Sequence, residues 1–125
     1  MELTRVPEPE AGALRAYVHA VQERWGVLLV DVILFGSQAR GDAHPDSDID
    51  VVVILDRADA EALSDVRGLA FDIWLSHHVL LSIRAFSQAS WQALAARGSL
   101  FFRTVTRDGI SWLPERARDA VESSA

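Results

Sequence analysis

Two short groups of residues, Gly36-Ser37 and Asp48-Ile49-Asp50, have residue types that can together hold a metal-bound nucleoside triphosphate. Gly36 lets the backbone turn sharply and approach a ligand closely. Ser37 provides a hydroxyl at a point where a helix would begin, so that free backbone N–H groups could face a phosphate. The first group therefore predicts a phosphate-binding turn.

The second group places two carboxylates two residues apart. In a strand, side chains at this spacing point to the same face of the sheet, so Asp48 and Asp50 can share one cation. Oxygen ligands of this kind suit Mg²⁺, which proteins usually hold through one or two carboxylates together with substrate phosphates and water. The sequence thus predicts that Mg²⁺ and a nucleotide bind together.

The joint pattern resembles a known family. The two groups are separated by ten residues, and this spacing is similar to the signature of the minimal nucleotidyltransferases of the DNA polymerase β-like nucleotidyltransferase superfamily. The pattern lies between two apolar runs, and Arg40, Gly41 and Ser47 follow the form common among the minimal members.

The resemblance implies both a fold and an activity. The fold would be α/β or α+β, a small mixed sheet flanked by helices, with the active site at one end of the first two strands. The activity would be Mg²⁺-dependent transfer of a nucleoside monophosphate, with AMP from ATP favoured, to a hydroxyl group, releasing pyrophosphate. Asp48 and Asp50 would be the catalytic metal ligands. The nucleotide-binding residues would be Gly36, Ser37, Arg40 and Ser47.

The position of Arg40 in the sequence independently suggests that it binds phosphate. It lies three residues after Ser37, on the same side of a short helix beginning there, and its guanidinium could bind a phosphate oxygen pair. The alternative is a salt bridge to Asp42, Asp46 or Asp48, which at an exposed site would contribute little.

The third carboxylate of the superfamily has no evident counterpart. The strand expected to supply it, residues 79–86, contains no acid, and Ser82 is the candidate for that position by alternation. Asp72 is the acid nearest in sequence before this strand, but helical periodicity places it on the solvent side of its helix. The chain could be a one-metal enzyme, a slow enzyme, or a nucleotide-binding relative that has lost transfer.

Composition narrows the class of protein. The chain has 125 residues, and we expect one domain over 1–125 with a tail over 114–125. It has no cysteine, which excludes disulfides and thiolate chemistry. No apolar stretch is long enough for a membrane span and no signal peptide is evident, so a soluble, cytoplasmic protein is expected.

The formal net charge of −6, without a lysine-arginine block, makes nucleic acid an improbable substrate. The acceptor is then a small molecule or a protein. The small size is similar to that of antitoxins paired with HEPN-type toxins, which would make the acceptor a hydroxyl of the toxin and the assembly a homo- or hetero-oligomer. One alternative is an aminoglycoside-like nucleotidyltransferase, and another is a catalytically impaired nucleotide-binding antitoxin.

Periodicity predicts the elements that must position these residues. Helices are expected over 11–25, 63–77, 88–96 and 101–107, with Gly26 ending the first and Ser87 capping the third. Strands are expected over 27–35, 48–55, 79–86 and 110–113. The helix over 63–77 is expected to bury Leu63, Val66, Leu69, Ile73 and Trp74.

Overall fold

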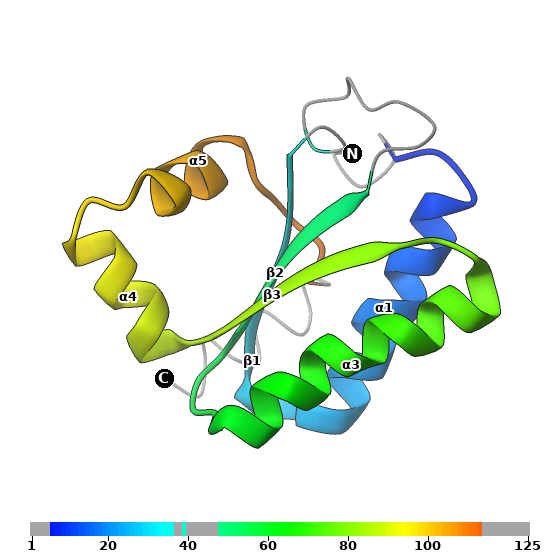
Figure 1. The fold of residues 1–125 in the computed structure, drawn as a ribbon, viewed down its shortest axis with the longest axis horizontal. Helices are drawn as coiled ribbons and strands as arrows, with labels where there is room; N and C mark the ends of the chain where they lie inside the picture. The colour runs from blue at the N-terminus through cyan, green and yellow to red at the C-terminus, as the bar shows by residue number, and fades with distance from the viewer. Residues whose placement is uncertain (1–5, 37–38, 40–47, 114–125) are drawn as a thin grey trace.

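The protein is described by a computed structural model that covers residues 6–36, 39 and 48–113. Within this part of the chain, two layers of helices enclose a four-stranded sheet (Figure 1). The helical elements are α1 (Glu10–Trp25), the 3₁₀ helix η2 (Gly26–Leu28), α3 (Ala60–His77), α4 (Gln88–Ala96) and α5 (Leu100–Asp108). The strands are β1 (Leu29–Phe35), β2 (Ile49–Leu55), β3 (Leu81–Ser87) and β4 (Ile110–Ser111).

The sheet is mixed, as the family resemblance implies. Its order is β3-β2-β1-β4; β1 runs antiparallel to both β2 and β4, and β2 runs parallel to β3. The register pairs Phe35 with Asp50 and Asp50 with Ser82. The end of β1 and the beginnings of β2 and β3 therefore meet at one edge of the sheet.

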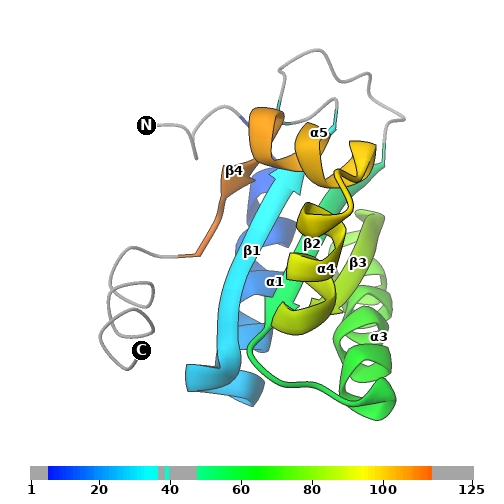
Figure 2. The same cartoon turned by 90° about the vertical axis from the view of Figure 1, so that its left-hand side faces the viewer.

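One face of the sheet is covered by α1 and α3, which lie together behind the strands in Figure 2. The strands bury a continuous apolar surface here because their alternate residues are all aliphatic. The two helices are also joined by a buried hydrogen bond, in which the Tyr17 hydroxyl donates to the Val66 carbonyl over 2.7 Å. The strand residues on this face include Leu29, Leu34, Ile49, Val51, Val53, Leu55 and Leu81.

The opposite face is covered by the two short helices α4 and α5 (Figure 2). Val52 and Ile54 of β2 pack here against an aromatic cluster, and Trp91 is its buried centre. Edge-to-face and tilted ring contacts of this kind add to the stability from area burial alone. The cluster comprises Phe35, Phe86, Trp91, Phe101 and Phe102.

Three of the four helices begin at a side-chain cap. Asp59 accepts from the Ala62 N–H at α3, Ser87 accepts from the Ser90 N–H at α4, and Ser99 accepts from the Phe102 N–H at α5. Each cap satisfies one of the N–H groups that a helix start leaves without a partner. The cap predicted at Ser87 is confirmed.

Several expectations were wrong in detail. The strand expected over 79–86 is Leu81–Ser87, and the strand expected over 110–113 is only Ile110–Ser111. The strand predicted from residue 27 begins at Leu29, because Gly26–Leu28 forms a 3₁₀ turn and leaves Val27 72% exposed. Trp74, expected in the core, is 44% exposed, because α3 meets the sheet through Val66 and Ile73. Among the described residues, no helix is both long and apolar enough to span a membrane.

Candidate active site

Gly36 and Asp50 meet at the edge where β1 ends. Gly36 has φ +77°, a left-handed conformation that glycine adopts without steric cost. A Cβ atom at this position would lie 2.6 Å from Oδ2 of Asp50, closer than atoms can approach without something shifting. The glycine therefore makes room for the carboxylate, and the two halves of the predicted motif are brought together in space.

Asp48 lies one residue before β2 and is exposed, whereas Asp50 lies inside the strand and is half-buried. The intervening residue is fixed to the neighbouring strand segment, because the Ile49 N–H donates to the Leu80 carbonyl over 3.3 Å. Ile49 is buried in the core under α1 and α3, so the alternation of β2 turns Asp50 toward the opposite face. Both predicted metal ligands thus belong to one edge of the sheet.

Ser82 occupies the position beside Asp50 on the next strand. The parallel register pairs these two residues, and Arg84, two positions further, stacks its guanidinium 5.1 Å from the Phe101 ring centre. The face of β3 that carries Ser82 is therefore the face covered by α5. Asp72, by contrast, is exposed on α3, in agreement with its solvent-side periodicity.

The donor chemistry at this edge fits one magnesium ion better than two. Among the described residues, no cluster of three or more His, Cys, Asp or Glu side chains could hold a metal ion. Asp48 and Asp50 offer carboxylate oxygens, and Mg²⁺ commonly takes its remaining ligands from substrate phosphates and water. The glycine beside Asp50 leaves that carboxylate uncovered by any side chain of residue 36.

Three of the predicted site residues, Ser37, Arg40 and Ser47, lie outside the described residues, as do Asp42 and Asp46. Their roles remain predictions. Ala39, the one described residue between Gly36 and Asp48, is buried in the core that α1 and α3 cover.

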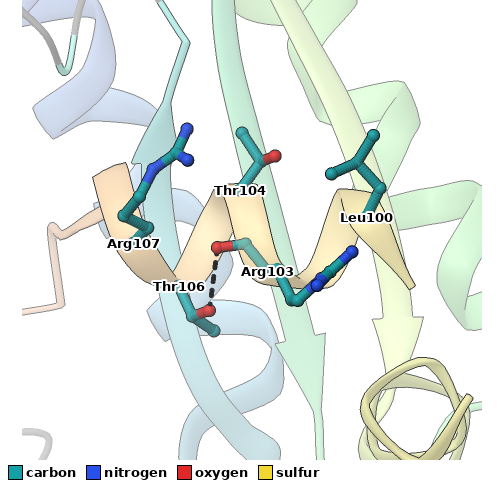
Figure 3. A pocket seen from close by; sticks show the side chains of 5 residues that line it. All are labelled: Leu100, Arg103, Thr104, Thr106 and Arg107. Carbon is teal, nitrogen blue, oxygen red and sulfur yellow. Dashed lines mark hydrogen bonds between the residues drawn. The ribbon is translucent and has the colours of Figure 1, made fainter. Parts of the chain in front are cut away.

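A flank of α5 borders the same edge and was not singled out from the sequence. Phe101 packs edge-to-face against Phe35 with ring centres 5.5 Å apart, so α5 is fixed to the residue preceding Gly36. The Phe102 side chain packs against Trp91 of α4, with ring centres 4.9 Å apart. The flank of α5 away from α4 therefore faces the end of β1, and Figure 3 shows Leu100, Thr104 and Arg107 projecting in that direction.

This flank lines a pocket of about 520 Å³ together with Arg103 and Thr106. Arg107 is held in place by its neighbour, since its Nε and Nη2 donate to the two carboxylate oxygens of Asp108 over 3.0 and 3.1 Å. These hydrogen bonds raise the pKa of the Arg107 guanidinium. Helical spacing of residues 100, 104 and 107 was visible in the sequence, but only the packing of α5 shows which way they point.

The fold and this edge combine a mixed sheet between helices with a glycine turn against a strand aspartate. Comparison with known families assigns the chain to one of them. The chain belongs to the nucleotidyltransferase domain family, whose family model matches residues 14–92. The matched segment contains Gly36, Asp48 and Asp50, but ends before α5.

One curated relative is a protein of Methanocaldococcus jannaschii that is named as a protein adenylyltransferase. It is 38% identical over 47 residues, which are 38% of this chain and 47% of the relative. The matched region thus spans about half the length of that relative.

Solved structures share the fold. A protein from Sulfolobus solfataricus described as a nucleotidyltransferase is 19% identical, with a TM-score of 0.50 over 81% of this chain and 77% of that one. A toxin–antitoxin structure with AMP-PNP is 18% identical, with a TM-score of 0.51, and a mutant of the toxin–antitoxin MntA-HpeT is 16% identical, with a TM-score of 0.50. Each of the latter two matches covers 87% of this chain and 81% of that one. At these identities the likeness concerns the fold.

Proposed function

We propose that this protein transfers a nucleoside monophosphate, AMP from ATP, to a hydroxyl group of a partner protein in a Mg²⁺-dependent reaction. The observation that carries the proposal is the contact between Gly36 and Asp50. It joins a turn suited to phosphate binding to a carboxylate suited to Mg²⁺. The family to which the chain belongs supports the same reading.

In this mechanism the acceptor oxygen forms a bond to the α-phosphorus as the bond to the pyrophosphate oxygen breaks. Asp48 and Asp50 would hold the magnesium ion, which when bound would supply positive charge to neutralise the phosphate oxygens. The protein contributes mainly by positioning, which can supply a large part of a rate enhancement. Gly36, Ser37, Arg40 and Ser47 are the proposed nucleotide ligands, and Asp48, the more exposed carboxylate, is the proposed acceptor of the hydroxyl proton.

A protein acceptor is favoured by an exposed apolar surface on α3, the helix that precedes β3 in the chain. Phe71, Trp74 and Leu75 are 63%, 44% and 58% exposed, and their spacing on α3 makes them neighbours. We call these three residues the α3 patch. Such a patch, on the order of 300 Å², is of a size that often serves recognition.

The α3 patch leads along the chain to the candidate site. Leu80, which follows α3 and is 53% exposed, has its carbonyl bound to the Ile49 N–H between the two site carboxylates. A partner that extends from the patch past Leu80 would reach the end of the sheet that carries Asp48 and Asp50. The toxin–antitoxin assemblies that share the fold are consistent with a HEPN-type toxin as this partner and with a hetero-oligomeric complex.

A second candidate function is supported by Ser82. A serine beside Asp50 provides no third carboxylate. Among the described residues, a second metal ion therefore has no evident carboxylate ligand, and Asp48 would have to bind the metal ion and accept the proton as well. The protein would then bind the nucleotide and its partner without transferring AMP, and act as an antitoxin by contact.

The two candidates are separated by incubating the protein and its purified partner with α-phosphate-labelled ATP and Mg²⁺. Transfer predicts a labelled partner protein and one pyrophosphate released per label, both lost in the Asp48→Asn/Asp50→Asn variant. A stable complex without label, with or without bound ATP, would favour the contact antitoxin. Label on a small molecule in place of the partner would contradict the protein acceptor.

A further inference from the structure

We propose that the Thr104–Arg107 flank of α5 is a binding site for the phosphate groups of the nucleotide, at the end of the sheet where β1 meets β2. This inference rests on the proposed function, since it assigns further residues to the same substrate. The expected ligand is an anion with several oxygen atoms that also binds a divalent cation. A triphosphate has this chemistry.

The position of the flank is fixed by the aromatic cluster. Phe101 contacts Phe35 directly before Gly36, and Val105 is fully buried beneath α5. At the other end of the helix Gly109 lies so close to β1 that a Cβ there would fall 2.5 Å from Ile33 Cγ2. The helix is therefore held at both ends against the strand that carries the glycine turn.

The donors of the flank suit a phosphate. Asp108 occupies two of the five N–H donors of the Arg107 guanidinium, so three remain and the planar group is oriented before a ligand arrives. Figure 3 shows this group on the same side as the Thr104 hydroxyl. Arginine binds phosphate through two parallel N–H donors, and an oriented guanidinium loses less freedom on binding.

The α5 flank differs from the rest of the molecule in the sign of its charge. The chain carries a net charge of −6, and Asp48 and Asp50 add negative charge at the site edge. Arg103 and Arg107 line one pocket on α5, and Asp108 offsets one of their two positive charges, so this surface keeps a net positive charge. A nucleotide of three phosphates approaching an acidic molecule is attracted by such a local positive potential.

The test is calorimetric titration of the full chain with Mg²⁺·ATP and, separately, with Mg²⁺·tripolyphosphate, which has the phosphates but no nucleoside. Arg107→Gln is expected to weaken both ligands by a similar factor, about tenfold, because a bidentate charged contact is lost. Arg107→Lys, which keeps the charge without the fork, should weaken them less, and Thr104→Val should have a smaller effect. The matched control is Arg97→Gln, since Arg97 is an exposed arginine at the end of α4.

Unchanged affinity of Arg107→Gln for both ligands would overturn the assignment, and so would a loss confined to ATP, which would place the nucleoside at the flank. A similar loss in Arg97→Gln would also overturn it, because the effect would then be one of net charge. Failure of the proposed function has a different signature: the unsubstituted protein would bind neither ligand.

Discussion

The two faces of the central sheet contrast most clearly along β2. Ile49, Val51, Val53 and Leu55 lie under the long helices α1 and α3 and are buried throughout the strand. On the other face, Val52 and Ile54 are covered by α4 and α5, but this cover stops short of Asp50, which is half-buried. One strand thus stabilises the fold with one face and presents its candidate chemistry on the other.

The difference follows from the length of the covering helices. Helices α1 and α3 contain 16 and 18 residues, whereas α4 and α5 contain 9 each. Two short helices cover the middle of the face with aromatic side chains and leave its edge for a ligand. A carboxylate pair under α1 or α3 would be desolvated at a large cost in free energy, so only the partly covered face can carry it.

The first prediction concerns the close approach of Gly36 to Asp50. Gly36→Ala should lower the affinity for Mg²⁺·ATP on the order of 100-fold, because the new Cβ displaces a metal-binding carboxylate. Gly98→Ala is a matched control: its φ is +66°, but a Cβ there meets no atom within 4 Å. Both variants should lose about 1–2 kcal/mol of stability through the left-handed backbone. Equal nucleotide affinity in the two variants would contradict the role of the contact.

A second prediction separates recognition of the partner from nucleotide binding. The Phe71→Ser/Leu75→Ser variant should reduce labelling of the partner protein about tenfold, since much of an interface's affinity comes from a few large side chains. Its affinity for Mg²⁺·ATP should not change, because the α3 patch lies on the face covered by α1 and α3. Val27→Ser removes an equally exposed apolar side chain elsewhere and should keep full labelling. Normal labelling by the double variant would show that the α3 patch does not bind the partner.

The third prediction concerns a carboxylate added beside Asp50, on the face of the sheet that α4 and α5 cover in part. Ser82→Asp places a carboxylate at the position paired with Asp50, where a further metal ligand would raise Mg²⁺ affinity about tenfold in the presence of ATP. Transfer to the partner should rise with it if the missing acid limits the reaction. Weaker Mg²⁺ binding in this variant would show that Ser82 does not face the metal. Ser90→Asp, at an exposed site on α4, controls for added charge.

The smallest expected effect comes from a substitution between α1 and α3, on the other face of the sheet. Tyr17→Phe removes the hydrogen bond to Val66 and should lower the free energy of unfolding by about 1 kcal/mol in urea denaturation, with nucleotide affinity unchanged. A measurable loss of affinity would mean that the two faces are not independent.

The same residue predicts a pH dependence. Burial raises the pKa of the Tyr17 hydroxyl above that of the unfolded chain, which is about 10. Its contribution to stability is therefore present below about pH 10 and is lost as the pH rises further, because the unfolded state then releases a proton that the folded state retains. Tyr17→Phe should remove this part of the alkaline decline, as measured by urea denaturation between pH 8 and 11.

Sequence reasoning located the motif and most elements because these depend on local patterns. Gly36, Asp48 and Asp50 were found from their spacing, and the alternation of β2 placed Asp50 and Val52 on one face. The position of Ser82 beside Asp50 also follows from alternation, although only the parallel register shows the pairing.

What the sequence did not reveal depends on packing between distant elements. The α5 flank can be placed near the candidate site only because Phe101 contacts Phe35, 66 positions earlier in the chain. Trp74 was assigned to the core because the apolar period of α3 continues through it, yet the helix meets the sheet on a narrower stripe. Val27 extended the apolar run of β1, but Gly26 and the 3₁₀ turn place it outside the strand.

The central claim is that Asp48 and Asp50 hold a metal-bound nucleotide at the open edge of the sheet. Its most direct test is calorimetric titration with ATP in the presence and absence of Mg²⁺, for the unsubstituted protein and for Asp48→Asn/Asp50→Asn. We expect Mg²⁺-dependent binding by the unsubstituted protein, and we expect the double variant to lose it while its unfolding transition stays cooperative. Binding of equal strength in the double variant, or no binding by the unsubstituted protein, would contradict it.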